Sequence, residues 1–263
     1  MRNTPKKIAA CAMKMWASTA FCLYTACASL TGAHAQTQPA DTGGLLQSWA
    51  DSADGTPPSP WRVVGLPGGK VPLLAPDITT LDGQKVLRLR SDKSYGALSH
   101  AVPAGSEGRY LQWQWRLDQP LAQADLRSKT GDDAALKVCA LFDLPLEKIP
   151  FVERNLLRLA RRVSAEALPG ATLCYVWDNQ LPAGTTLNNA YTARVRLRVL
   201  NGNGDALGRW VSHKRDLQAD FLAAFGNETD TVPPLLAIVT GADADNTGGT
   251  SLGFVNRLQL MKQ

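Results

Sequence analysis

Hydrophobic and polar positions alternate along most of the chain from Trp61 onward. In 111–118 the alternation is unbroken: leucine and tryptophan occupy the odd positions, and polar or charged residues occupy the even ones. A period of two is typical of a β-strand with one face buried and the other exposed. The segment 86–90 repeats the pattern with arginines on its polar side. Further strands are expected at 136–142, 173–177, 193–200, 207–213, 235–240 and 251–260.

Two segments show the longer period of an α-helix. Residues 151–165 are amphipathic, and the Pro169-Gly170 pair closes them. A second helix is expected to begin after Asp216, a favourable N-cap residue, and to end at Gly226. We expect the first helix to have one apolar side, formed by Leu156, Leu157, Ala160 and Val163. Its other side is expected to be basic and is formed by Arg154, Arg158, Arg161 and Arg162.

The first helix has two interpretations. It can cover one face of a sheet with its apolar side, which is the interpretation we favour because Glu153 and Glu166 dilute its positive charge. Alternatively, a basic amphipathic helix can bind an anionic membrane surface.

Many strands, few helices and no strand-helix-strand rhythm predict an all-β fold. We expect a two-sheet antiparallel β-sandwich of the jelly-roll or galactose-binding-like type, with two short surface helices. A closed barrel is the alternative. The Asn-Gly-Asn-Gly run at 201–204 predicts a hairpin between its flanking strands.

The first 35 residues have the pattern of a signal peptide. Four basic residues precede an apolar run over 15–27, and Ala33-His34-Ala35 is a small-x-small cleavage site. Cleavage after Ala35 would place the protein in the periplasm or outside the cell, with no membrane span in the mature chain. A lipoprotein anchored at Cys27 is the alternative, which we disfavour because Tyr24 stands where such sites usually carry leucine. Residues 36–60, rich in Gly, Pro and Ser, are expected to form a flexible arm before a single domain over 61–263.

Removing the signal peptide changes the charge balance. The chain carries 28 Lys and Arg against 23 Asp and Glu; four of the bases and none of the acids precede residue 36, which leaves 24 against 23. A nearly neutral chain lacks the basic surface that nucleic-acid binding requires, so we expect no nucleic-acid partner.

Two cysteines, Cys139 and Cys174, follow the signal peptide, and both lie in predicted strands. An oxidising compartment permits a disulfide between them. They can equally remain two buried thiols, because sequence does not give the distance between them.

Two acidic clusters could carry chemistry. Asp132 and Asp133 precede a predicted strand, and such a pair of carboxylates could serve acid–base catalysis or bind Ca²⁺. The simpler interpretation is a turn in which the two side chains accept hydrogen bonds from the backbone and pair with a nearby arginine. Asp243, Asp245 and Asn246 resemble the opening of a calcium loop, although Phe254 stands where an EF-hand has its glutamate. We therefore expect no cofactor, with calcium as the alternative.

A row of basic side chains is the strongest candidate for ligand binding. Alternation places Arg194, Arg196 and Arg198 on one face of a strand, where they repel each other unless carboxylates or an anionic ligand lie opposite. Arginine binds carboxylates and phosphates in a bidentate manner. The simpler interpretation is a solvated face balanced by Asp132, Asp133 or Asp178.

Trp177, beside Asp178, could stack a sugar ring at the rim of such a site, or it could belong to the core. Trp113 and Trp115 are expected in the core because they alternate with polar residues. No serine-nucleophile elbow, phosphate-binding loop or zinc motif is present in the sequence, so catalytic residues stay unassigned.

Nine short motifs, taken together and in order, resemble an exported bacterial domain-of-unknown-function family, the 3047 family. They are Gly131-Asp132-Asp133, Tyr175-Val176-Trp177, Tyr191-Thr192, Arg194-Val195-Arg196, Leu207-Gly208-Arg209-Trp210-Val211, Arg215-Asp216, Ala219-Asp220-Phe221, Ala224-Phe225-Gly226 and Asp243-Ala244-Asp245-Asn246-Thr247-Gly248. The resemblance covers residues 45–261 and implies an exported β-sandwich. It brings no established activity, so no catalytic residue follows from it.

Three functions remain open. The first is a non-enzymatic periplasmic protein that binds a glycan or an acidic small molecule through Asp132, Asp133, Trp177, Asp178, Arg194 and Arg196. The second is a carbohydrate-active hydrolase or lyase that uses the same carboxylates. The third is a structural envelope protein with no ligand.

Overall fold

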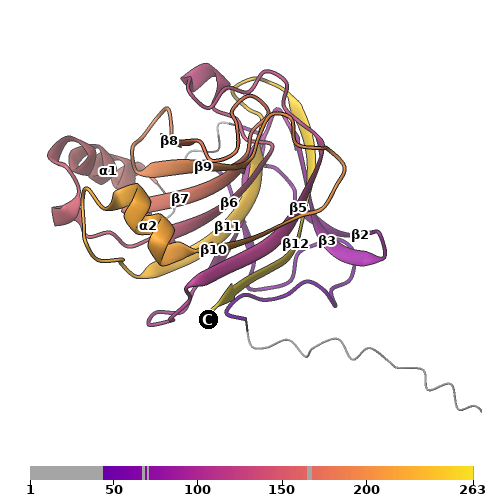
Figure 1. The fold of residues 1–263 in the computed structure, drawn as a ribbon, viewed down its shortest axis with the longest axis horizontal. Helices are drawn as coiled ribbons and strands as arrows, with labels where there is room; N and C mark the ends of the chain where they lie inside the picture. The colour runs from indigo at the N-terminus through magenta and orange to yellow at the C-terminus, as the bar shows by residue number, and fades with distance from the viewer. Residues whose placement is uncertain (1–43, 67–68, 70, 165–167, 263) are drawn as a thin grey trace, which may run out of the picture. The chain divides into compact units, whose positions relative to one another are not determined.

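The computed structural model describes residues 44–66, 69, 71–164 and 168–262 (Figure 1). All of them lie within one compact unit, Asp41–Gln263. The predicted signal peptide lies outside the described residues.

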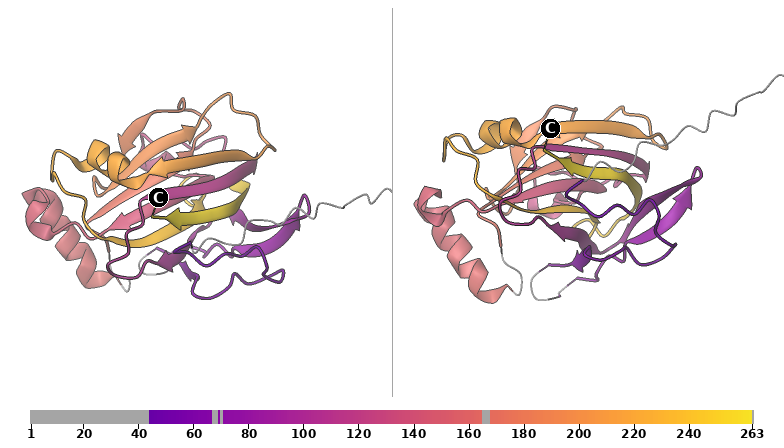
Figure 2. Two further views of the ribbon diagram at one scale, coloured as in Figure 1. Left: turned by 60° about the horizontal axis from the view of Figure 1, so that its bottom comes forward. Right: turned by 90° about the horizontal axis from the view of Figure 1, so that it is seen from below.

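Two β-sheets make up the body of this unit (Figures 1 and 2). The larger has seven strands in the order β1-β4-β11-β6-β7-β9-β8: β1 Arg62–Val64, β4 Tyr95–Ala101, β11 Leu235–Asp243, β6 Leu136–Phe142, β7 Ala171–Trp177, β9 Val195–Asn201 and β8 Thr186–Asn188. The smaller has five strands in the order β10-β5-β12-β3-β2: β10 Val211–Asp216, β5 Tyr110–Gln119, β12 Thr250–Met261, β3 Gln84–Asp92 and β2 Asp77–Leu81. The predicted all-β sandwich is confirmed.

Neighbouring described strands pair antiparallel, except for β7 and β9, which run parallel. The predicted hairpin at 201–204 is wrong, because β9 and β10 belong to different sheets. The intervening loop instead crosses from one sheet to the other. Asp205 holds its start by accepting hydrogen bonds from the Asn201 side chain and the Gly202 N–H.

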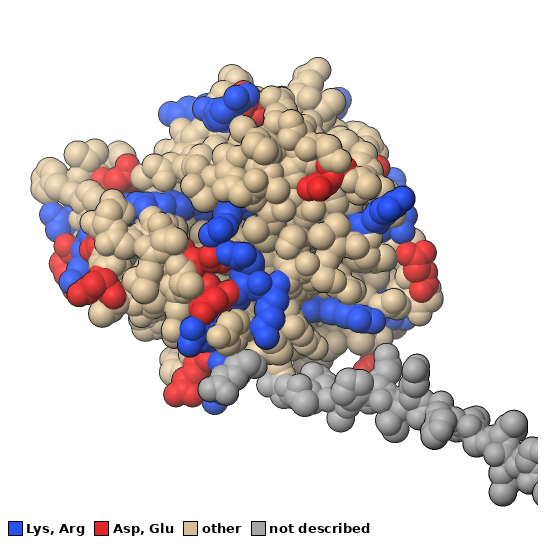
Figure 3. Space-filling view, in the orientation of Figure 1, with Lys and Arg blue, Asp and Glu red and all other residues tan. Residues whose placement is uncertain are grey.

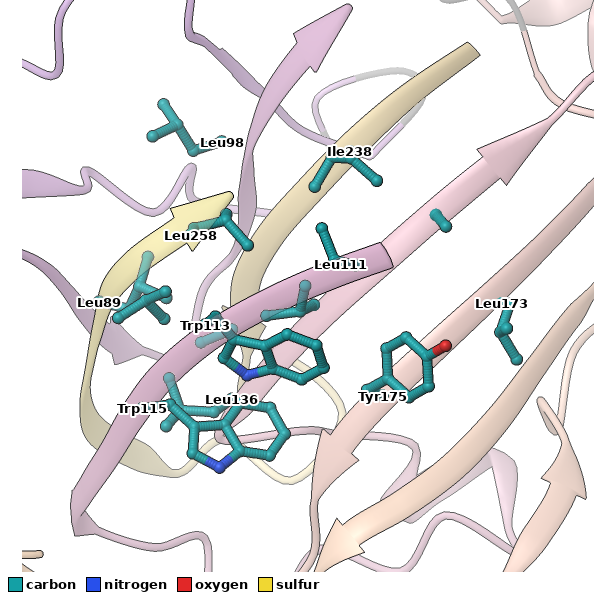
Figure 4. Close-up of a cluster of buried hydrophobic side chains, with 14 of the residues drawn as sticks. Leu89, Leu98, Leu111, Trp113, Trp115, Leu136, Leu173, Tyr175, Ile238 and Leu258 are labelled. Carbon is teal, nitrogen blue, oxygen red and sulfur yellow. The ribbon is translucent and has the colours of Figure 1, made fainter. Parts of the chain in front are cut away.

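The main core lies between the two sheets. The residues that alternate along β5, Leu111, Trp113, Trp115 and Leu117, are all at most 1% exposed, as predicted. Each such side chain contributes about 1.5–3 kcal/mol to folding by leaving water. Trp113 packs on Trp115 and on Tyr175 from the opposite sheet, with ring centroids 5.5 and 5.3 Å apart (Figure 4). These contacts fix β5 against β7.

A second apolar cluster lies on the other face of the larger sheet. It includes Leu197 and Val199 of β9 and Val239 of β11. Cys139 and Cys174, directly opposite each other on β6 and β7, join this cluster and form a disulfide with an S–S distance of 2.08 Å. The disulfide therefore links two central strands of the sheet.

The second predicted helix is confirmed as α2, Leu217–Phe225. The Asp216 carboxylate accepts hydrogen bonds from the backbone N–H groups of Gln218 and Ala219, which is the N-cap role expected from sequence. Leu217, Phe221 and Phe225 are buried against the core.

The first predicted helix forms as α1, Phe151–Val163, but its orientation differs from the expectation. Leu157 is buried, whereas Leu156 is 57% and Leu159 60% exposed. The helix lies at the periphery of the sandwich (Figure 2). The expected apolar side is therefore divided, with Leu157 in the core and Leu156 in solvent.

The predicted flexible arm over 36–60 is wrong for residues 44–60. Leu46 and Trp49 are buried in the core, and the Leu45 N–H donates to the Leu260 carbonyl. The indole of Trp61 donates to the Gln47 carbonyl at 2.8 Å. A few large apolar residues outweigh the Gly- and Pro-rich composition that suggested an arm.

Candidate functional site

The arginine row lies where β9 meets α2. Arg196 and Arg198 project from the face of β9 opposite Leu197 and Val199, and Arg194 precedes the strand. As the sequence predicted, the two faces of the strand separate apolar from basic side chains. The basic face is only partly solvated, however, because α2 and the loop after it pack against it.

Two carboxylates that the sequence analysis did not select neutralise most of this row. Glu228, whose side chain is 2% exposed, binds both Arg194 and Arg196. The contact between Arg194 and Glu228 is bidentate, with both N–O distances at 2.7 Å. Arg196 also donates to the Ala224 carbonyl, and its guanidinium lies 4.2 Å from the Phe225 ring centroid. The row is therefore anchored to the end of α2.

Asp220 of α2 is the second carboxylate, and it joins the two sheets. It binds Arg198 of β9 at 2.9 Å and Arg215 of β10 at 2.5 Å. The hydroxyl of Tyr175 donates to the same carboxylate at 2.7 Å. Burial, followed by the charge of Asp220, raises the pKa of Tyr175 far above its usual range. The tyrosine therefore stays a neutral donor.

The charges of this network do not balance. The network contains three carboxylates, those of Glu228, Asp220 and Glu153, and Glu153 lies 3.8 Å from Arg194. It contains four guanidinium groups, those of Arg194, Arg196, Arg198 and Arg215. Figure 3 shows basic and acidic side chains close together on the face that carries α2. One positive charge in excess remains, and Arg198, with 31% of its side chain exposed, is the most accessible of the three arginines in the row.

A cleft of about 360 Å³ opens beside this network, between β8, β9 and α2. Arg196, Arg198 and Asp220 supply its charged lining, Asn188 and Thr186 add polar groups, and Leu173 and Leu187 add apolar surface. A concave site with a few convergent polar groups is the usual form of a small-molecule site.

The two acidic clusters predicted from sequence come together at a second location. Asp133, which is 1% exposed, accepts hydrogen bonds from the backbone N–H groups of Asn246 and Thr247 and from the Thr247 hydroxyl. Its carboxylate thus holds the loop 243–249. Both oxygens are used in this way, so Asp133 is not free for acid–base catalysis.

Asp132 has a different environment from its neighbour. Burial raises its pKa from 3.8 to about 6, although the amide of Asn189 donates to the carboxylate at 2.6 Å. The negative charge of Asp243 adds to the rise. A carboxyl group that titrates near neutrality can act as a general acid.

Two of the predicted calcium ligands, Asp243 and Asn246, have other partners in the structure. The Asp243 carboxylate accepts from the Ala134 N–H and pairs with Lys137 at 2.5 Å, while Asn246 donates to Asp132 and Asp133 and accepts from the Tyr191 hydroxyl. Among the described residues, no three His, Cys, Asp or Glu side chains come together to hold a metal. Calcium at Asp243, Asp245 and Asn246 stays a prediction.

Trp177 and Asp178 do not join either location. Trp177 is 2% exposed and packs against Trp115, so the prediction of a sugar-stacking platform is wrong. Asp178 is buried and accepts hydrogen bonds from the backbone N–H groups of Gln180 and Leu181, which form a turn. Neither Asp132, Asp133 nor Asp178 pairs with the arginine row, contrary to the predicted balance.

Glu228, Asp220 and Arg215 were not among the residues that the sequence pattern marked as functional. Asp220 left a detectable signal, because it falls on the buried stripe of α2 with Leu217 and Phe221. An acid on the apolar side of a helix requires a buried partner. Glu228 follows the helix in a loop, and no periodicity marks it.

Comparison with known proteins identifies a family and a set of similar folds. The family model described as "Protein of unknown function (DUF3047)" matches residues 59–259. A search of curated proteins gave no significant match.

Solved structures with a similar arrangement include TmCBM61, determined in complex with β-1,4-galactotriose, with 10% identity, a TM-score of 0.38, and coverage of 84% of this chain and 100% of that one. A family 12 xyloglucanase from Bacillus licheniformis shows 11% identity and a TM-score of 0.43, covering 80% and 99% of the two chains. The endoglucanase cel12A from Rhodothermus marinus shows 13% identity and a TM-score of 0.36, and the match covers 76% of this chain and 97% of that one. At these values the likeness indicates neither a ligand nor an activity.

Proposed function

Because this chain belongs to the DUF3047 family, whose function is unknown, we propose a function from its own cleft: it binds a small acidic ligand under α2. The ligand class is a carboxylate-bearing molecule such as a uronate-containing glycan or an organic acid. The predicted signal peptide supports a periplasmic or secreted setting for this binding.

The excess positive charge beside the cleft carries the proposal. Arg198 shares Asp220 with Arg215, so neither guanidinium has a carboxylate of its own. A bidentate carboxylate from a ligand would use the donors that Arg198 retains. Asn188 and Thr186 offer hydrogen-bonding groups for hydroxyls of the same ligand.

Calorimetric titration of the protein with oligogalacturonate, with neutral galacto-oligosaccharide as the matched ligand, tests this function. We expect binding of the acidic oligomer only, and at least a tenfold loss in Arg198→Gln. Arg90→Gln, at an exposed position of β3, is the matched control. Equal binding of the acidic and the neutral oligomer would contradict the proposal. Failure of every ligand in an acidic panel to bind would also contradict it, and would favour a structural role for the arginine network.

Hydrolysis of a glycan is the second candidate function, and the raised pKa of Asp132 favours it. Asp243 interacts electrostatically with Asp132 and is paired with Lys137, so the two carboxylates have different environments. Such a difference separates a general acid from a charged partner. Release of reducing ends from a polysaccharide panel, abolished in Asp132→Asn, would establish this activity over simple binding.

A further inference from the structure

The helix α1 presents a row of apolar side chains to solvent. Val152, Leu156 and Leu159 are 67%, 57% and 60% exposed, and Phe151 at the start of the helix is 69% exposed. At 3.6 residues per turn, the first three fall within an arc of about 60° on the helix surface. They form one continuous stripe, which we call the α1 stripe.

The contacts of α1 with the rest of the protein explain this orientation. Leu157 packs into the main core, the Arg161 guanidinium donates to the Leu168 carbonyl at 2.9 Å, and Glu153 lies 3.8 Å from Arg194. The ionic partner of Glu153 is part of the arginine network, so the side of the helix that carries Glu153, Leu157 and Arg161 faces inward. The α1 stripe faces outward as a consequence.

Basic side chains border the stripe on one side. Arg158 and Arg162 are exposed and lie within about 100° of it around the helix. The single acid of the helix, Glu153, is on the inward side. The outward surface of α1 therefore combines apolar side chains with positive charge and carries no negative charge.

We propose that α1 docks this protein onto the surface of an anionic phospholipid bilayer. The α1 stripe would enter the boundary between headgroups and acyl chains, while Arg158 and Arg162 contact lipid phosphates. Four apolar side chains are far fewer than the about 20–30 residues that each partner contributes to a stable protein–protein interface. An amphipathic helix, in contrast, binds a membrane surface with its apolar face alone. Among the described helices, none has both the length and the apolar character needed to cross a bilayer.

Vesicle sedimentation tests the proposal. The protein is expressed with its complete sequence, so that leader processing occurs as in the cell, and is mixed with vesicles of phosphatidylglycerol and phosphatidylcholine or of phosphatidylcholine alone. We expect sedimentation with the anionic vesicles only, weakened by salt. Removal of each arginine, in Arg158→Gln and Arg162→Gln, should weaken binding about fivefold at low salt.

The double variant Leu156→Gln/Leu159→Gln should reduce binding at least tenfold. Both side chains are exposed, so the fold should survive, which the melting temperature would verify. Leu222→Gln on α2, a leucine that is 39% exposed, is the matched control and should bind as the parent does. Equal sedimentation of the double variant and this control, binding to neutral vesicles alone, or a dimer that dissociates in the double variant would overturn the proposal.

Discussion

The carboxylate of Asp133 accepts hydrogen bonds from the backbone N–H of Thr247, at 2.7 Å, and from its hydroxyl, at 2.5 Å. These two residues lie 114 positions apart in the chain. The contact ties the loop after β11 to the segment that enters β6, neighbouring strands of the larger sheet. It explains why an acidic pair that suggests catalysis has one member with a structural role.

Replacing Asp133 should therefore destabilise the fold. Asp133→Ala leaves two backbone N–H groups and a hydroxyl without their acceptor, and we expect a loss of about 3 kcal/mol in the free energy of unfolding. Urea denaturation measures it. Asp51→Ala, at an exposed turn position, is the control and should change stability by less than about 0.5 kcal/mol. Equal midpoints for the two variants would show that the loop does not depend on this carboxylate.

The raised pKa of Asp132 predicts a pH-dependent effect on stability. Its folded-state pKa of about 6 lies above the ordinary value of 3.8, so the folded state favours the protonated form. The stabilising contribution is fully present below pH 3.8 and is lost as the pH rises through about 6.

Asp132→Asn mimics the protonated form at every pH. We expect the melting temperature of the variant to equal that of the parent protein near pH 3.8. At neutral pH the melting temperature of the variant should be higher, because the parent protein must then bury a charge. Asp51→Asn should show no such trend. A difference that does not vary with pH would mean that Asp132 titrates normally.

Glu228 should be essential for the packing of the arginine network. Glu228→Gln leaves Arg194 and Arg196 without their shared counter-charge, and breaking a buried ion pair in this way costs about 3–5 kcal/mol. Glu107→Gln removes an acid whose side chain is 80% exposed, so it should cost less than about 1 kcal/mol. Thermal denaturation of both variants would decide, and similar melting temperatures would contradict a buried role for Glu228.

The disulfide between Cys139 and Cys174 should stabilise the larger sheet. It closes a loop of 35 residues, for which restriction of the unfolded chain predicts about 3–4 kcal/mol. The urea midpoint should therefore fall on addition of dithiothreitol, and Cys139→Ala/Cys174→Ala should be unaffected by the reductant. A parent protein that unfolds identically with and without reductant would contradict this expectation.

Local pattern was sufficient for most regular elements. The apolar run over 136–142 was predicted as a strand and forms β6 with the same bounds, and Asp216 and Gly226 marked the limits of α2. The strand predicted at 207–213 was only partly right, because β10 begins at Val211 and the preceding residues form the turn between sheets. The strand β4 was missed because both of its faces are buried and each carries apolar and polar residues, which removes the period of two.

The candidate site could be predicted only in part. The spacing of Arg194, Arg196 and Arg198 shows that they share a face, and the burial of Val199 follows from the same pattern. Their partners Glu228 and Asp220 come from a helix and loop that pack across the strand, at separations of 22 to 34 residues. No periodicity encodes such a contact.

The sequence by itself determined the class of fold, most of the strands, and which side chains each strand places on a common face. These properties depend on backbone geometry and on the separation of apolar from polar residues, both of which are local. Only the tertiary structure decided that Asp133 holds a distant loop, that Trp177 is buried, and that α1 turns Leu156 and Leu159 outward. Each of these outcomes depends on which segments pack together, and packing is set by the sum of contacts over the whole chain.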